Sequence, residues 1–172
     1  MSHKLIYPKK HSNLHKMDVA ITILKIRELA FSLIEEKVDE TGLSIGFSVE
    51  TDINFDEETF EIKVNYSLKS NLTGLSYVQI KVSNLFRISN LKDYSTEDKA
   101  HVTLPHTTLI TMLSLSISHT RALLAKNTAG TTLEQYLLPI VNPTEIAKQI
   151  FKIPIVKENS PISKSSKPKV KS

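Results

Sequence analysis

Strict alternation of apolar and polar residues over two consecutive segments constrains this chain more than any other feature. The apolar positions of these segments are Leu43, Ile45, Phe47, Val49 and Ile53, then Phe60, Ile62, Val64, Tyr66 and Leu68. Successive side chains of a strand point to opposite faces, so a period of two predicts two strands with one buried and one solvated face each. The short acidic connection at 54–58 predicts that they form an antiparallel hairpin.

Two further segments complete a predicted four-stranded antiparallel sheet of meander-like order. After a turn at 69–74, alternation resumes over 78–82 and continues at Phe86 and Ile88. The segment 20–33 fits both a strand and a helical stripe, because its apolar positions change phase near Leu24 to Ile26. A β-bulge shifts the faces of a strand by one residue. We therefore favour a long bulged strand, with a helix as the alternative.

Proline and glycine mark the predicted helices. Pro fits the first turn of a helix, so Leu104-Pro105 opens a helix that runs to about Asn127 or Ala129, before Gly130. Pro139 and Pro143 then impose extended geometry on an apolar loop at 137–141. Asn142-Pro143-Thr144-Glu145 has the pattern of a capped helix start. The predicted fold class is α+β: a four-stranded antiparallel sheet, a long helix, a proline-braced loop and a short helix.

Charge divides the chain into three parts. Residues 1–19 carry four lysines against one aspartate, and residues 153–172 carry five lysines against one glutamate, whereas residues 20–152 hold 13 basic and 16 acidic residues. The overall net charge of +4 therefore belongs to the ends. We expect a flexible basic segment at 1–19, one domain at 20–152, and a disordered Lys-rich tail at 153–172. A mildly acidic body argues against a nucleic-acid-binding face on the domain itself, so any such binding would be a property of the basic ends.

The sequence offers little catalytic chemistry. Cysteine is absent, which excludes disulfides, thiolate nucleophiles and cysteine-based metal sites. No phosphate-binding loop, dinucleotide fingerprint, His-Glu-x-x-His or Gly-x-Ser-x-Gly motif occurs. His101 and His106 flank the predicted start of the long helix, but their spacing matches no metal-ligand rule, and His119 is expected to be a packed or interface histidine. We expect no enzyme, metal or cofactor; a small hydrolase using His101 or His106 is the alternative.

The apolar loop at 137–141 is the main candidate for a binding function. Its side chains need burial, either in the domain's own core or against a bound chain. If they are buried against a bound chain, the loop, the short helix and the sheet would form an apolar groove. An extended, unfolded polypeptide could bind in this groove and also pair with a strand edge. No apolar run approaches the about 18 residues of a membrane span, and no secretory signal is visible, so we expect a cytoplasmic protein.

The order of these elements resembles the SecB chaperone family over residues 20–152. The motifs that carry the resemblance are Leu104-Pro105, His119-Thr120-Arg121-Ala122, Ala129-Gly130-Thr131 and Leu138-Pro139-Ile140-Val141-Asn142. The resemblance implies an ATP-independent holdase that keeps clients unfolded, assembled as a tetramer from two dimers through sheet edges and long helices. The client would be a preprotein for export or the antitoxin of a toxin–antitoxin module, and both roles stay open.

The resemblance also implies site residues. The client groove would include Phe31, Tyr77, Val78, Phe86, Leu138, Ile140 and Val141. Glu28 lies near a partner-docking position on the exposed sheet face, but Ser32 and Gln79 stand where export members are acidic, so docking to SecA stays open as a weaker expectation than client binding. The competing class is an RNA- or ribonucleoprotein-binding accessory protein acting through the basic ends.

Overall fold

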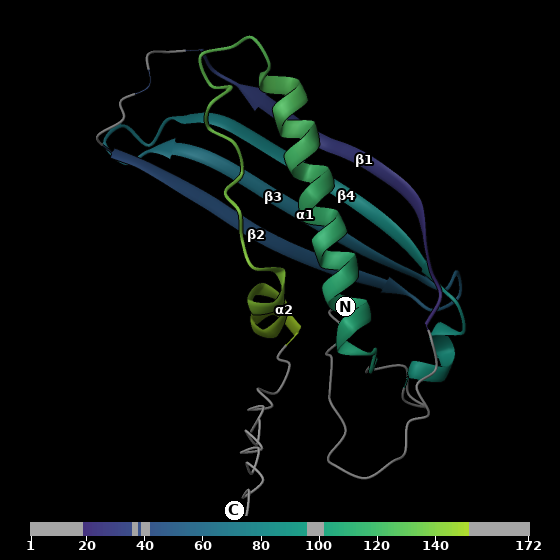
Figure 1. Cartoon of the computed structure of the whole chain (residues 1–172). Coiled ribbons are helices and arrows are strands. Elements are labelled where there is room, and N and C mark those ends of the chain that lie inside the picture. The colour runs from purple at the N-terminus through teal and green to yellow at the C-terminus, as the bar shows by residue number, and fades with distance from the viewer. Residues whose placement is uncertain (1–18, 36–37, 39–41, 96–101, 152–172) are drawn as a thin grey trace, which may run out of the picture.

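The computed structural model describes residues 19–35, 38, 42–95 and 102–151 of the chain. The predictions about the basic segment before Val19, the Lys-rich tail and His101 lie outside these residues. Within them, four strands precede a long and a short helix (Figure 1). The predicted α+β class is therefore confirmed.

The four strands form one antiparallel sheet with the order β1-β4-β3-β2. The strands are β1 (Ile21–Leu33), β2 (Leu43–Asn54), β3 (Thr59–Ser70) and β4 (Ser76–Ile88). The predicted hairpin of β2 and β3 is confirmed, but the meander-like order is wrong for the first strand, since β1 pairs with β4. This pairing sets Ile21 and Ile23 opposite Ile88 and Phe86, which extends the apolar face of β4 across the edge of the sheet.

Bulges explain why the sequence of β1 was ambiguous. The pairing of β1 with β4 shifts register between Ile23 and Lys25 and again between Glu28 and Ala30. Each extra residue moves the following side chains to the other face, so the apolar positions of β1 do not keep a period of two. The bulged strand is confirmed near Leu24, and the helical alternative is wrong.

Both helices lie on the same face of the sheet, which we call the helix face (Figure 1). The long helix α1 (His106–Thr128) follows Pro105 and packs mainly on β4 and β3, and Gly130 adopts a left-handed φ of 77° after it. The short helix α2 (Pro143–Phe151) begins where the side chain of Asn142 accepts a hydrogen bond from the Thr144 backbone N–H, 3.0 Å away. Both helix starts agree with the proline signals. A short 3-10 helix, η2 (Leu91–Tyr94), follows β4.

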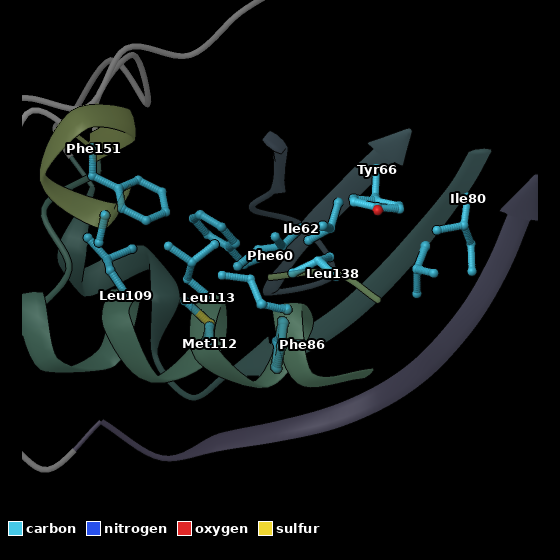
Figure 2. Packing of buried hydrophobic residues seen from close by; sticks show 14 of the residues in the cluster. Phe60, Ile62, Tyr66, Ile80, Phe86, Leu109, Met112, Leu113, Leu138 and Phe151 are labelled. Carbon is cyan, nitrogen blue, oxygen red and sulfur yellow. The ribbon is translucent and has the colours of Figure 1, made fainter. Parts of the chain in front are cut away.

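The core lies between the helix face and these helices (Figure 2). The rings of Phe60 and Phe151 meet edge to face with centroids 6.4 Å apart, which ties α2 to β3. The labelled residues of the core are Phe60, Ile62, Tyr66, Ile80, Phe86, Leu109, Met112, Leu113, Leu138 and Phe151. The opposite face of the sheet, which we call the open face, carries neither α1 nor α2.

Small hydroxyl side chains let α1 sit close to the sheet. Ser116, Thr120 and Thr128 are fully buried, and each hydroxyl donates to the carbonyl four residues earlier at 2.8–2.9 Å. These groups are satisfied within their own helix, so their burial leaves no unpaired donor. No helix in the part of the chain that the structure describes has the length and apolar character needed to cross a membrane.

Candidate functional site

The loop at 137–141, which joins α1 and α2, is fixed at several points although it has no regular structure. Leu138 is only 2% exposed and fills the core, while the Tyr66 hydroxyl donates to the Tyr136 carbonyl at 3.3 Å. Arg121 of α1 donates from Nε to the Leu138 carbonyl at 3.1 Å and from a terminal nitrogen to the Pro139 carbonyl at 2.9 Å. Ile140 is nevertheless 94% exposed. The fold therefore holds a large aliphatic side chain in solvent on an anchored backbone.

Strand β2 adds accessible apolar surface on the helix face. Ile45 and Phe47 pair with Leu68 and Tyr66, so they share the face that carries the core. Ile45 is still 51% exposed and Phe47 is only partly buried, because α1 lies over β4 and β3 and β2 forms the edge of the sheet. The hydrogen bond from Tyr66 to Tyr136 brings the loop over this part of the sheet (Figure 1). We call Ile45, Phe47, Leu137 and Ile140 the β2–loop surface.

A second apolar surface follows β1 at the other edge of the sheet. Its large side chains are 39–43% exposed: Ile23, Leu24, Ile26 and Leu29. Leu24 and Leu29 occupy the two bulges, and Ile23 and Ile26 lie on the helix face opposite Phe86 and Asn84. A 13-residue edge strand with this much accessible apolar surface is typical of an interface with another chain.

The predicted client-binding residues divide into buried and accessible groups. Tyr77, Val78, Phe86 and Leu138 are at most 4% exposed and belong to the protein's own core. In this conformation they offer no surface to a second chain. Phe31 and Val141 are partly buried, and Ile140 is almost fully exposed.

Sequence reasoning missed the contribution of β2 and of the exposed Leu72 in the turn after β3. The alternation already placed Ile45 and Phe47 on an apolar face. It could not indicate that β2 would be an edge strand beyond the reach of α1, because all four strands carry a similar apolar face.

Glu28 does not lie where it was expected. It pairs with Val82 of the helix face, and its carboxylate accepts a hydrogen bond from Nδ2 of Asn127 at 2.5 Å. The expectation that Glu28 belongs to the open face is therefore wrong, since the bulge after Ile23 moves it to the opposite side. Ser32 and Gln79 do face each other across β1 and β4 on the open face.

Several charged groups on the open face are paired with one another. Glu61 lies within 3.0 Å of Lys63 and 3.4 Å of Arg27, and the Ser83 hydroxyl donates to it. Burial raises the pKa of Glu61, but the bonds from Ser83 and Lys63 and the two cations outweigh burial and lower this pKa below 4.5. This arrangement keeps Glu61 ionised and stabilises the sheet, so we assign it no binding role.

The described histidines belong to no group of side chains that could bind a metal ion. Nδ1 of His119 lies 2.7 Å from Oδ1 of Asn84, which fits the expected packed histidine between α1 and β4. Burial lowers the pKa of His106, which keeps this side chain neutral at physiological pH. Among the described residues, no group of three or more His, Asp or Glu side chains could hold a metal ion.

Comparisons with known proteins give a likeness in structure but none in sequence. No family model matches the sequence, and no curated protein matches it. In structure the chain is similar to the SecB-like chaperone Rv1957 of Mycobacterium tuberculosis, solved in complex with a ChAD peptide from the Rv1956 HigA1 antitoxin. The two share 17% sequence identity with a TM-score of 0.46, over 70% of this chain and 89% of that one. At this distance, function has to be argued from the residues of this chain.

Proposed function

We propose that this protein is an ATP-independent chaperone that binds unfolded or aggregation-prone polypeptides on the β2–loop surface. The observation that carries the proposal is the 94% exposure of Ile140 on a backbone anchored by Leu138, Tyr66 and Arg121. An anchored loop cannot collapse to bury Ile140 in its own core. A second chain that covers Ile140 therefore gains hydrophobic stabilisation without first having to order the loop.

The geometry of β2 supports an extended client. Strand β2 pairs only with β3 among the described strands and without a register shift, so its outer edge can pair with the backbone of another chain. Side chains at alternate positions of the added strand would then lie beside Ile45 and Phe47. Burying one such aliphatic side chain contributes about 1.5–3 kcal/mol, which suits a weak contact that is insensitive to sequence.

Assembly through β1 would account for the second apolar surface. A second copy covering Ile23, Leu24, Ile26 and Leu29 agrees with the dimer of dimers that the sequence resemblance implies. A tetramer would carry four client surfaces, and a client bound at one of them engages the next intramolecularly. We propose such a homotetramer, acting in the cytoplasm.

The two client classes, a preprotein and an antitoxin, remain alternatives of the same proposal, since both present apolar segments before folding. SecA is not included as a partner. Glu28 bonds to Asn127 on the helix face, and Ser32 and Gln79 are uncharged on the open face.

The test is suppression of aggregation of chemically denatured citrate synthase, without nucleotide, over a titration of the full-length protein. We expect suppression at near-stoichiometric ratios, and its weakening by Ile140→Asp, because a carboxylate at this position would have to be desolvated on binding. Thr132→Asp, on an exposed turn of the same connection, is the matched control and should leave suppression intact. Unchanged aggregation at every ratio would refute the proposal.

A further inference from the structure

We propose that Arg121 is a positioning residue for client binding, which holds the loop at 137–141 in the shape that exposes Ile140. The inference rests on the proposed function and extends it to a residue of α1 that does not belong to the β2–loop surface. It concerns the conformation of the loop at 137–141 in the protein without a bound client.

Two consecutive backbone carbonyls converge on one guanidinium. Nε of Arg121 donates to the Leu138 carbonyl at 3.1 Å, and a terminal nitrogen donates to the Pro139 carbonyl at 2.9 Å. Successive carbonyls of a regular strand point to opposite sides, so this double contact fixes a local turn of the backbone directly before Ile140. The planar guanidinium, with donors in a rigid fork, suits such a two-point contact.

Among the described residues, the guanidinium of Arg121 serves only these two hydrogen bonds. In the described part of the chain no carboxylate forms an ion pair with Arg121, and its side chain donates to these two carbonyls. A positive side chain that only improved solubility would gain nothing from this placement. Hydrogen bonds from a charged donor are stronger than neutral ones, so the pair is well suited to restrain an irregular segment.

The loop has few other restraints at this point. Pro139 has no backbone N–H to donate, and the segment from Leu137 to Val141 belongs to no helix or strand. Leu138 anchors it by burial and Tyr66 by a hydrogen bond to Tyr136, but both act before Pro139. The hydrogen bond from Arg121 to the Pro139 carbonyl is therefore the last restraint on the backbone before the exposed Ile140.

This arrangement predicts a loss of affinity without a matching loss of stability. When Arg121 is removed, Ile140 samples many orientations, and a client must order the loop on binding. We expect Arg121→Ala to weaken binding of an unfolded polypeptide roughly tenfold, the effect of losing a preorganising contact. Arg121→Lys keeps the charge but lacks the fork, and its loss of affinity should be intermediate.

The experiment combines a spectroscopic and a binding measurement on the full chain. Because the protein contains no cysteine, Ile140→Cys introduces a single site for a nitroxide label. The label should be more mobile in the Arg121→Ala background than in the parent, and unchanged with Lys126→Ala, an exposed cation on the same helix. Affinity for reduced, carboxymethylated α-lactalbumin, which stays unfolded, and urea unfolding are measured on the unlabelled variants with Ile140 intact.

The outcomes separate this inference from the proposed function. If the unaltered protein does not bind the unfolded probe, the proposed function fails. Unchanged label mobility and affinity in Arg121→Ala would overturn the positioning role and leave the chaperone proposal standing. A fall in affinity that only follows a comparable loss of global stability would also overturn it, because Arg121 would then support the fold as a whole.

Discussion

Two aliphatic residues of one loop, separated by a single proline, should respond in opposite ways to truncation. Leu138 is 2% exposed within the core, whereas Ile140 is 94% exposed. Leu138→Ala removes buried methyl groups and leaves a cavity in the core, whereas Ile140→Ala removes groups that contact mainly water. The first change therefore tests the fold, and the second tests the proposed site.

The magnitudes follow from these environments. Truncating a buried leucine costs about 2–5 kcal/mol, and we expect about 3 kcal/mol for Leu138→Ala because the irregular loop can relax in part. Ile140→Ala should change the unfolding free energy by less than about 0.5 kcal/mol. If a client half to fully buries Ile140, its truncation costs about 1–2 kcal/mol of binding free energy, which is roughly a five- to thirtyfold loss of affinity.

Urea unfolding followed by far-ultraviolet circular dichroism measures the first quantity, and binding of reduced, carboxymethylated α-lactalbumin measures the second. The reasoning is refuted if Ile140→Ala destabilises the fold as much as Leu138→Ala does. It is equally refuted if Ile140→Ala leaves the affinity for the unfolded probe unchanged.

Three further outcomes are expected. Glu61→Gln should lower the unfolding free energy at neutral pH and make it decline less steeply in acid. The pKa of Glu61 is lower in the folded than in the unfolded protein. The stabilisation that ionised Glu61 provides is therefore present above the unfolded pKa and is lost as the pH falls through the folded pKa. Urea midpoints across this acid range test it, and equal slopes for both proteins would contradict it. Tyr66→Phe should cost about 1 kcal/mol in the same assay, since the bond to Tyr136 is lost. Ile26→Asp should reduce the assembly mass measured by light scattering, and an unchanged mass would argue against an interface at β1.

The local pattern was enough to predict most of the secondary structure. Alternation predicted β2, β3 and β4, because each directs its large apolar side chains mainly to one face of the sheet. Pro105 and Pro143 predicted the starts of α1 and α2, since proline is tolerated only in the first turn of a helix. Strand β1 was harder to predict, because its two bulges depend on the partner strand and interrupt the period.

The candidate site depended on features that no local pattern contains. An apolar residue in a strand or loop looks the same in sequence whether it faces its own core or a bound chain. Phe86 and Leu138 are buried because α1 and the rest of the core cover them, and Ile45 is accessible because β2 pairs at the edge of the sheet. Glu28 changed faces because of a single extra residue in β1.

The sequence by itself thus determined which residues are apolar, where strands and helices form, and that a proline-rich connection follows α1. Only the tertiary structure decided which apolar residues stay accessible, because exposure depends on what packs above each side chain. Arg121 and Leu138, 17 residues apart along the chain, meet only in the folded protein, and their contact leaves Ile140 in solvent.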